Sequence, residues 1–279
     1  MALPNTLTGI NQYAFQNCTG LTKIDIANTK VTSIGQYSFN NCTNLLEVTF
    51  PNTLEYLNKD GTFKGCTNLQ KVDLSNTKIS YIAHYTFQNC TNVAEIKLPS
   101  TLKSTGYSSF ESIKGLTKID LTNTQLTSIG NYSFKWCTNV QEVILPETVT
   151  SIGSSAFQEC GNMEKINLHS TKITSISPYT FLACKKLKSI EIPNTVTNIR
   201  EGVFQSCEGL ETLILPNSLV SIGRVVFADC PLIKEIRIPS TVTSVGQNAF
   251  NINSLVNGKL YVPFTKAEGK PSGWVRWLE

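Results

Sequence analysis

The amino-acid sequence predicts an α/β solenoid: a right-handed stack of about eleven repeats of 23–24 residues, with a parallel sheet on its concave face and short helical or 3-10 arcs on its convex face. Three observations support this fold class. Phenylalanine returns to one position every 23 or 24 residues, cysteine follows it by three residues, and a short run of alternating polar and apolar residues comes next. A fixed period of this length is typical of repeat architectures, in which each unit buries its apolar side only against its neighbours.

The arc of each repeat is predicted from its phenylalanine and cysteine. Eleven of the thirteen phenylalanines occupy one position: Phe15, Phe39, Phe63, Phe87, Phe110, Phe134, Phe157, Phe181, Phe204, Phe227 and Phe250. All nine cysteines follow three residues later, at Cys18, Cys42, Cys66, Cys90, Cys137, Cys160, Cys184, Cys207 and Cys230. Ile113 and Asn253 take the two remaining places, and a further apolar residue such as Leu45 follows after three more. This spacing predicts one side of a short helical turn.

The strand of each repeat is predicted from the run after the arc. Segments such as 23–26 (KIDI) and 118–121 (KIDL) alternate polar and apolar residues, which indicates a short strand with one buried face. A turn and two apolar residues three apart, such as Val31 and Ile34, complete the unit as an extended bend. Parallel strands need a connection of a dozen or more residues, which each repeat supplies. At ~4.8 Å per strand the stack is roughly 50 Å long.

Composition and charge exclude several classes of protein. The chain has 279 residues, is 41% hydrophobic and carries a net charge of +4, with its basic residues unclustered; this gives no electrostatic case for nucleic acid. It contains no run of 18 apolar residues, so no transmembrane helix is expected. Residues 1–9 (MALPNTLTG) lack the features of a secretion signal and begin inside the repeat pattern. We therefore expect further sequence upstream.

The repeat unit closely resembles that of a known family. Residues 215–236, LPNSLVSIGRVVFADCPLIKEI, are similar to the BspA-like leucine-rich repeat, also called the LRR_5 type, and all eleven repeats fit its pattern. We expect a leucine-rich repeat solenoid over residues 1–263, truncated at its N-terminus. Residues 264–279 resemble the closing segment of such arrays, and we interpret them as a C-terminal cap in which Trp274 and Trp277 cover the end of the core. The resemblance implies a surface-exposed or secreted protein of host-associated bacteria that binds protein, without catalytic activity, and it supplies no site residues.

The cysteines and histidines predict no cofactor and no metal site. An odd number of cysteines without a C-x-x-C pair favours a buried, reduced cysteine ladder, the alternatives being disulfides or a metal centre. His84 and His169 lie 85 residues apart and support no catalytic arrangement, so we interpret them as surface or turn residues. The sequons at Asn17, Asn41, Asn89 and Asn131 are read as a product of the repeat pattern, with glycosylation as the alternative.

Charged residues alternate along the predicted sheet. Successive strands begin with Lys23, Glu47, Lys71, Glu95, Lys118, Glu142 and Lys165. Opposite charges on neighbouring strands attract and like charges repel. We therefore interpret the alternation as control of strand register together with solubility; the alternative is a polar surface that recognises a ligand.

The neighbouring outward column provides the candidate ligand-binding residues. In the second half of the chain this column mixes apolar, charged and aromatic residues, namely Ile144, Asn167, Glu191, Ile214, Arg237 and Tyr261. Outward apolar residues beside arginine and tyrosine are typical of binding patches. Random drift of a surface column is the alternative interpretation.

These observations favour a non-enzymatic protein-binding or adhesion module of a cell-surface or secreted bacterial protein, with the ligand on the concave sheet. The expected partner is a protein, either of the host extracellular matrix or of another microbial surface; nucleic acid and membrane insertion are not expected. The alternative is a structural spacer or self-associating display scaffold, which a featureless concave face and lateral self-association would favour. An enzyme would require clustered titratable groups, and the sequence offers none beyond the charge alternation.

Overall fold

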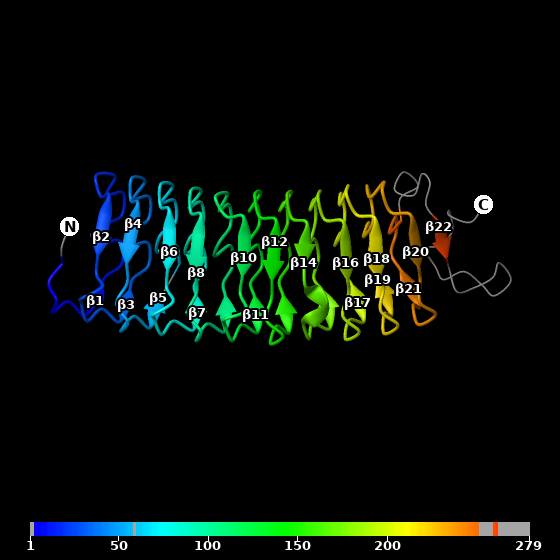
Figure 1. The fold of residues 1–279 in the computed structure, drawn as a ribbon, viewed down its shortest axis with the longest axis horizontal. Helices are drawn as coiled ribbons and strands as arrows, with labels where there is room; N and C mark the ends of the chain where they lie inside the picture. The colour runs from blue at the N-terminus through cyan, green and yellow to red at the C-terminus, as the bar shows by residue number, and fades with distance from the viewer. Residues whose placement is uncertain (1–2, 58–59, 251–258, 262–279) are drawn as a thin grey trace.

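The computed structural model describes residues 3–57 and 60–250, together with the backbone of residues 259–261. The chain forms a parallel β-solenoid of about ten turns with repeats of ~23 residues. Figure 1 shows the strands following one another along the long axis of the molecule. The predicted cap at residues 264–279, including Trp274 and Trp277, lies outside the described residues, as does Asn253.

The even-numbered strands form the face that the sequence predicts. They are β2 (Lys23–Asp25), β4 (Glu47–Thr49), β6 (Lys71–Asp73), β8 (Glu95–Lys97), β10 (Lys118–Asp120), β12 (Glu142–Ile144), β14 (Lys165–Ile166), β16 (Ser189–Glu191), β18 (Thr212–Ile214), β20 (Glu235–Arg237) and β22 (Lys259–Tyr261). The central residue of a strand points into the core, as the alternation predicts: Ile119 of β10 pairs in parallel register with Val143 of β12, and both are buried. We call this side the even-strand face. Its hydrogen-bonded ladder is interrupted between β4 and β6, β8 and β10, β14 and β16, and β18 and β20.

The odd-numbered strands form a second parallel sheet, which the sequence analysis described only as an extended bend. They are β1 (Gly9–Ile10), β3 (Ser33–Ile34), β5 (Tyr56–Leu57), β7 (Tyr81–Ile82), β9 (Ser104–Thr105), β11 (Ser128–Ile129), β13 (Ser151–Ile152), β15 (Ser175–Ile176), β17 (Asn198–Ile199), β19 (Ser221–Ile222) and β21 (Ser244–Val245). Strands β1 to β13 form one ladder and β15 to β21 another. We call this side the odd-strand face. It was missed because two residues are too few to show an alternating pattern.

The prediction of helical arcs, and with it the α/β class, is wrong. The arc, which connects each odd-numbered strand to the next even-numbered strand, is a series of turns. In the arc between β3 and β4, the Cys42 N–H donates to the Phe39 carbonyl at 3.1 Å, and the Leu45 N–H donates to the Cys42 carbonyl at 3.0 Å. From Phe15 to Phe227, the residues two before and two after each phenylalanine of the repeat position adopt positive φ, as at Tyr37 (50°) and Asn41 (57°). A left-handed residue on each side of the phenylalanine stops helix propagation. Among the described residues the single helix is the short 3-10 segment η1 (Leu168–Ser170), which lies outside the arcs.

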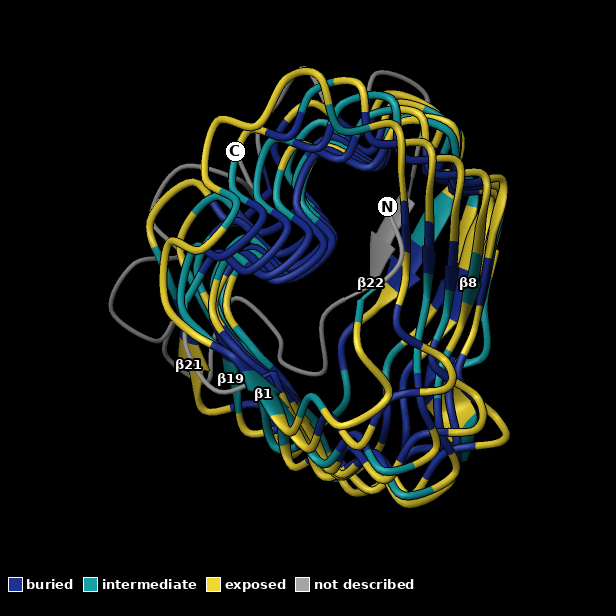
Figure 2. Ribbon diagram, turned by 90° about the vertical axis from the view of Figure 1, so that its left-hand side faces the viewer, coloured by how far each residue is buried: buried dark blue, intermediate teal, exposed yellow. Residues whose placement is uncertain are grey.

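The phenylalanines form one continuous stack in the interior. From Phe15 to Phe250, each ring lies 5.0–5.9 Å from the next, centroid to centroid, and within 19° of parallel. Figure 2, viewed along the stack, shows the buried residues on the inside of every turn and the exposed residues outside. The prediction of aligned repeats sharing one core is therefore confirmed for the described residues.

The cysteines are all unpaired, as expected, and eight of the nine are buried; Cys18 in the first repeat is exposed. Burial disfavours the charged thiolate, and it raises the pKa of Cys42 to about 11 and that of Cys90 to about 12. The buried ladder predicted from the sequence is confirmed from Cys42 to Cys230.

Candidate functional site

The alternating charges of the even-strand face form ion pairs within consecutive strand pairs. Ammonium and carboxylate groups lie 2.8 Å apart in Lys23–Glu47, 3.3 Å in Lys71–Glu95 and 3.3 Å in Lys118–Glu142. The hydrogen bond from Lys71 lowers the pKa of the Glu95 carboxyl. The hydrogen bond to Glu142 raises the pKa of the Lys118 ammonium. The predicted cross-strand attraction is therefore present along the first half of this face.

The first two predicted ligand-binding residues lie in the two turns that precede those of the other four. Ile144 ends β12 and is half-buried beside Asp120 of β10. Asn167 follows β14, and its side chain binds the backbone of Leu145: the amide oxygen accepts from the Leu145 N–H at 2.7 Å, and the amide nitrogen donates to the Leu145 carbonyl at 3.0 Å. The side chain of Asn167 thus continues the strand ladder where β14 ends, which accounts for this residue without a ligand.

The remaining four predicted residues lie in adjacent turns at the C-terminal end. Glu191 ends β16 and pairs in register with Ile214, which ends β18. Arg237 ends β20, and its backbone partner is Tyr261 at the end of β22. Glu191, Ile214 and Arg237 are exposed, and Ile214, at 57%, is the most exposed large hydrophobic residue in the described part of the chain. The side chain of Tyr261 lies outside the described residues.

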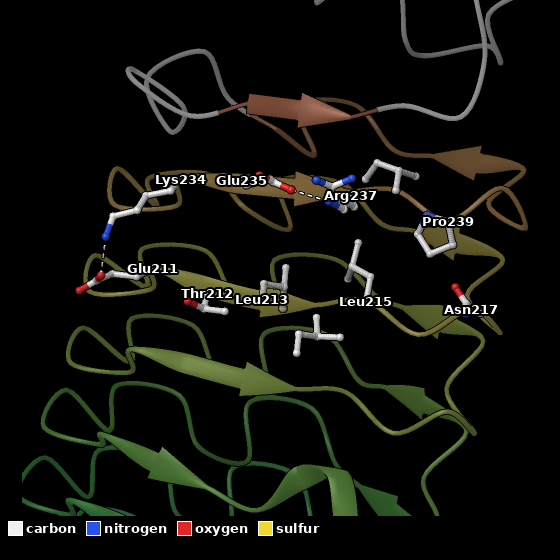
Figure 3. Close-up of a pocket in the computed structure, with 11 residues that line it drawn as sticks. Glu211, Thr212, Leu213, Leu215, Asn217, Lys234, Glu235, Arg237 and Pro239 are labelled. Carbon is white, nitrogen blue, oxygen red and sulfur yellow. Dashed lines mark hydrogen bonds and ion pairs between the residues drawn. The ribbon is translucent and has the colours of Figure 1, made fainter.

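A hollow of about 480 Å³ opens between β18 and β20, where the ladder is interrupted (Figure 3). It brings together two of the predicted residues, Ile214 and Arg237. The other lining residues are Glu211, Thr212, Leu213, Leu215, Asn217, Lys234, Glu235, Ile238 and Pro239. Its volume lies within the ~300–1,000 Å³ that is typical of ligand sites.

Ion pairs border this hollow. At one end the Lys234 ammonium donates a hydrogen bond to Glu211 at 2.9 Å, and this bond lowers the pKa of the Glu211 carboxyl. On β20, Arg237 is paired with Glu235 (Figure 3). The apolar residues Ile214 and Leu215 also line the hollow, which therefore combines apolar and charged residues.

Most of the lining of this hollow was not predicted from the sequence. The predicted residues belong to one outward column, whereas the hollow is also lined by residues of the turns before and after the strands, such as Lys234 and Pro239. The prolines that follow β18 and β20 by two residues, Pro216 and Pro239, do not single the hollow out. Pro146 and Pro193 stand at the same place after β12 and β16, and each of those strands pairs with the next even-numbered strand.

Residues 3–57 and 60–250 contain no group of three or more histidine, cysteine, aspartate and glutamate side chains that could hold a metal ion. The same part of the chain includes no helix of sufficient length and hydrophobicity to span a bilayer.

Comparison with known proteins agrees with the repeat pattern. The sequence profile of the family described as BspA type Leucine rich repeat region matches residues 1–74, 59–188 and 174–268. Among solved structures, a leucine-rich repeat protein from Bacteroides ovatus is 27% identical, with a TM-score of 0.55 over 90% of this chain and 54% of that one. This chain therefore spans about half the length of the Bacteroides protein. A comparison with curated proteins gave no match.

Two further solved structures share the fold at lower identity. The pneumococcal vaccine antigen PcpA is 18% identical, with a TM-score of 0.57 over 93% of this chain and 70% of the antigen. A leucine-rich cell surface protein from Faecalibacterium prausnitzii is 20% identical, with a TM-score of 0.50 over 89% of this chain and 78% of that protein. At these identities the likeness concerns the fold alone.

Proposed function

Because the chain belongs to the family of BspA-type leucine-rich repeat proteins, we propose that it is a non-enzymatic protein-binding module whose partner contacts the even-strand face at its C-terminal end. The proposed contact surface is the hollow between β18 and β20 together with Glu191 of β16 and Tyr261 of β22. The observation that carries the proposal is the exposure of Ile214 beside this hollow. Exposed aliphatic side chains bordered by polar groups mark interaction sites more often than isolated ones do.

The chemistry of the hollow suits a protein partner. Protein interfaces combine apolar anchors with polar residues around them, and here Ile214 and Leu215 line the same hollow as the ion pairs Glu211–Lys234 and Glu235–Arg237. The two ion pairs expose both signs of charge, so they favour a partner with mixed charges over a polyanion. The residues around the hollow are held by strands, which pre-organise the surface and lower the entropic cost of binding.

The proposed location is the cell surface or the extracellular space. It is supported by the likeness to the Faecalibacterium prausnitzii structure, which is described as a cell surface protein. We propose a protein of the host extracellular matrix, or a surface protein of another microbe, as the partner. Since the chain covers 54% of the related Bacteroides ovatus protein, it would act as one module of an adhesive surface.

The proposal is tested by a binding screen against immobilised host extracellular matrix proteins and microbial surface proteins. Ile214→Ser and the double variant Arg237→Ala/Tyr261→Ala should each weaken the captured interaction, by about tenfold for Ile214→Ser if it is an interface anchor. Val220→Ser is the matched control, because Val220 is also an exposed aliphatic residue (42%) but precedes β19 on the odd-strand face.

Two results would contradict the proposal. Equal affinity of the wild type and the two even-strand variants for a captured protein would remove this hollow from the binding surface. Concentration-dependent self-association that Ile214→Ser abolishes, with no protein captured in the screen, would instead support the self-associating scaffold. Analytical ultracentrifugation of the wild type and of Ile214→Ser distinguishes the two outcomes.

A further inference from the structure

The odd-strand face departs from its own pattern at two neighbouring strands. The outward residue of each odd-numbered strand is small or polar almost throughout: Gly9, Ser33, Ser104, Ser128, Ser151, Ser175, Asn198, Ser221 and Ser244. In β5 and β7 it is tyrosine instead, at Tyr56 and Tyr81, which are 51% and 41% exposed. The inward residues Leu57 and Ile82 pair in register and keep the core unchanged. The two tyrosines are therefore not needed by the fold, which accepts serine at the same place in seven of the other repeats.

The two tyrosines border a hollow of about 220 Å³. The other lining residues are Glu55, Leu57, Asp60, Ser80, Ala83 and His84. The ring of His84 meets that of Tyr81 edge-on, with centroids 6.3 Å apart and planes at 89°. This hollow contains two phenol rings, one imidazole and two carboxylates, a combination that recurs in no other repeat.

His84 is held in one orientation. Its Nδ1 accepts a hydrogen bond from the Tyr107 backbone N–H at 2.7 Å, so the neutral ring carries its proton on Nε2. Gly106 gives the space for this arrangement, because a Cβ at that position would lie 2.7 Å from both His84 Nδ1 and the Tyr81 hydroxyl. The walls of the hollow are thus fixed by the backbone of the following repeat.

Both carboxylates among the described residues that line the hollow are unmatched by a lysine or arginine in that lining. Glu55 and Asp60 both line it. In the described part of the chain, Glu55 forms one ion pair, with Lys78 at a distance of 3.9 Å, and no lysine or arginine forms one with Asp60. Burial, and after it the nearby Asp60 carboxylate, raises the pKa of the Tyr81 hydroxyl, which is the direction that a negative potential produces.

We propose that this hollow binds the guanidinium group of an arginine side chain presented by a partner polypeptide. Aromatic faces attract cations, and arginine in particular stacks on them while its planar fork donates to carboxylates. The volume is below the ~300–1,000 Å³ of typical small-molecule sites, so it suits a single side chain. The hollow lies on the odd-strand face, and the end view places β1, β19 and β21 of this face on a different side from β8 (Figure 2). The inference is therefore independent of the binding proposed for the even-strand face.

The two histidines of the chain provide the measurement, since each gives its own imidazole signals in an NMR spectrum. His84 lines the hollow, and His169 lies in η1, exposed and on another part of the molecule. Titration with the peptide acetyl-Gly-Arg-Gly-amide should shift the His84 signals in a saturable manner and leave those of His169 in place. The same peptide with citrulline, which is neutral and of equal shape, should leave both histidines in place.

Variants then assign the binding to the named groups. Asp60→Asn removes the charge without changing the shape, and Tyr81→Ala removes one aromatic face; each should weaken the peptide affinity about threefold or more. Tyr81→Phe keeps the ring and should bind within about twofold of the wild type. The controls are Asp120→Asn, on the even-strand face, and Tyr13→Ala, whose ring is 47% exposed in the first repeat. Both should bind the peptide as the wild type does.

Several results would overturn the inference. They are equal shifts for the arginine and citrulline peptides, equal shifts at both histidines, or unchanged affinity in Asp60→Asn. If Tyr81→Ala lowers stability, Asp60→Asn and Tyr81→Phe still decide the matter because both preserve side-chain volume. Ile214→Ser should leave the His84 titration unaltered, so failure of the even-strand proposal does not affect this test.

Discussion

The thiol of Cys66 donates a hydrogen bond to the carbonyl oxygen of Phe39, 3.1 Å away and 27 residues earlier in the chain. The same bond recurs for each buried cysteine, at 3.0–3.3 Å: Cys42–Phe15, Cys90–Phe63, Cys137–Phe110, Cys160–Phe134, Cys184–Phe157, Cys207–Phe181 and Cys230–Phe204. Except for Phe110, whose repeat has Ile113 in the cysteine position, each of these carbonyls also accepts the backbone N–H of the cysteine in its own repeat, as Phe39 does from Cys42. The cysteine is therefore both a small apolar residue and the donor that links one turn to the previous one.

Replacement of a central cysteine should destabilise the protein. Cys90→Ala removes the thiol bond to Phe63 and leaves a small cavity, so we expect the free energy of unfolding to fall by about 2 kcal/mol. Cys18→Ala, at an exposed thiol, should change it by less than about 0.5 kcal/mol. Urea denaturation followed by circular dichroism measures both. Equal midpoints for the two variants would show that the thiol bond contributes nothing.

Cys18 should react with thiol reagents faster than the other eight cysteines. In the folded protein, a disulfide-exchange reagent at pH 8 should modify one thiol per chain rapidly, that of Cys18, because the rest are buried. All nine should react in denaturant. Nine rapidly reacting thiols in the folded state would contradict the buried ladder.

Alkaline pH should weaken the fold through these thiols. Burial raises the pKa of Cys90 to about 12 from its ordinary value of 9.0. The stabilisation associated with the protonated thiol is therefore complete below pH 9 and is lost as the pH rises from 9 towards 12. The difference in unfolding free energy between the wild type and Cys90→Ala should shrink over this range, by up to about 1.4 kcal/mol per pH unit. A difference independent of pH up to 11 would contradict this account.

Truncation of a stacked phenylalanine should lower the free energy of unfolding most at the centre of the stack. Phe134 is buried between Phe110 and Phe157, so Phe134→Ala should cost about 3–5 kcal/mol of unfolding free energy. Phe15→Ala should cost less, since Phe15 is partly buried and stacks on Phe39 at the first repeat. Thermal and urea denaturation of the two variants provide the comparison. A larger loss for Phe15→Ala would contradict the view of one shared core.

A substitution at one position in the arcs should stabilise the protein. Val225 has a φ of 47°, a conformation that is strained for a β-branched residue and that asparagine accepts readily. Val225→Asn should raise the free energy of unfolding by about 1 kcal/mol. The reciprocal change Asn89→Val, at an exposed residue with a φ of 61°, should lower it by a similar amount. A stability change of the same sign in both variants would contradict the explanation by backbone strain.

The sequence predicted the features that repeat in every unit, because packing imposes them. The register of Phe39 on Phe63, the buried thiols and the strands with one inward residue follow from periodicity alone. The conformation of the arc did not follow, because apolar residues three apart occur both in a helical turn and in a series of turns, and the left-handed residues Tyr37 and Asn41 carry no unique signal. The sequence does contain one indication of left-handed residues at these two positions, because the third repeat has Gly61 and Gly65 there, with φ of 65° and 73°.

The candidate sites depend on departures from the repeat, which periodicity does not explain. Ile214 and Arg237 were recognised as unusual outward residues, but the hollow beside them depends on an interrupted ladder. Tyr56 and Tyr81 stand out only once it is known that their position faces outward and is usually serine. Asn167 was predicted to bind a ligand, whereas its polar atoms are already bonded to Leu145.

The hydrogen bonds that join neighbouring turns affect how the molecule would respond to a pulling force. The Phe39 N–H donates towards the following repeat, to the Thr62 carbonyl at 2.9 Å, while the Cys66 thiol donates towards the preceding one. These links run along the long axis, so tension between the two ends of the molecule loads them in series and peels turns away one at a time. At ~3.4 Å per extended residue, each repeat of about 23 residues releases roughly 80 Å of chain. Pulled from its two ends, an array of this kind would lengthen in steps.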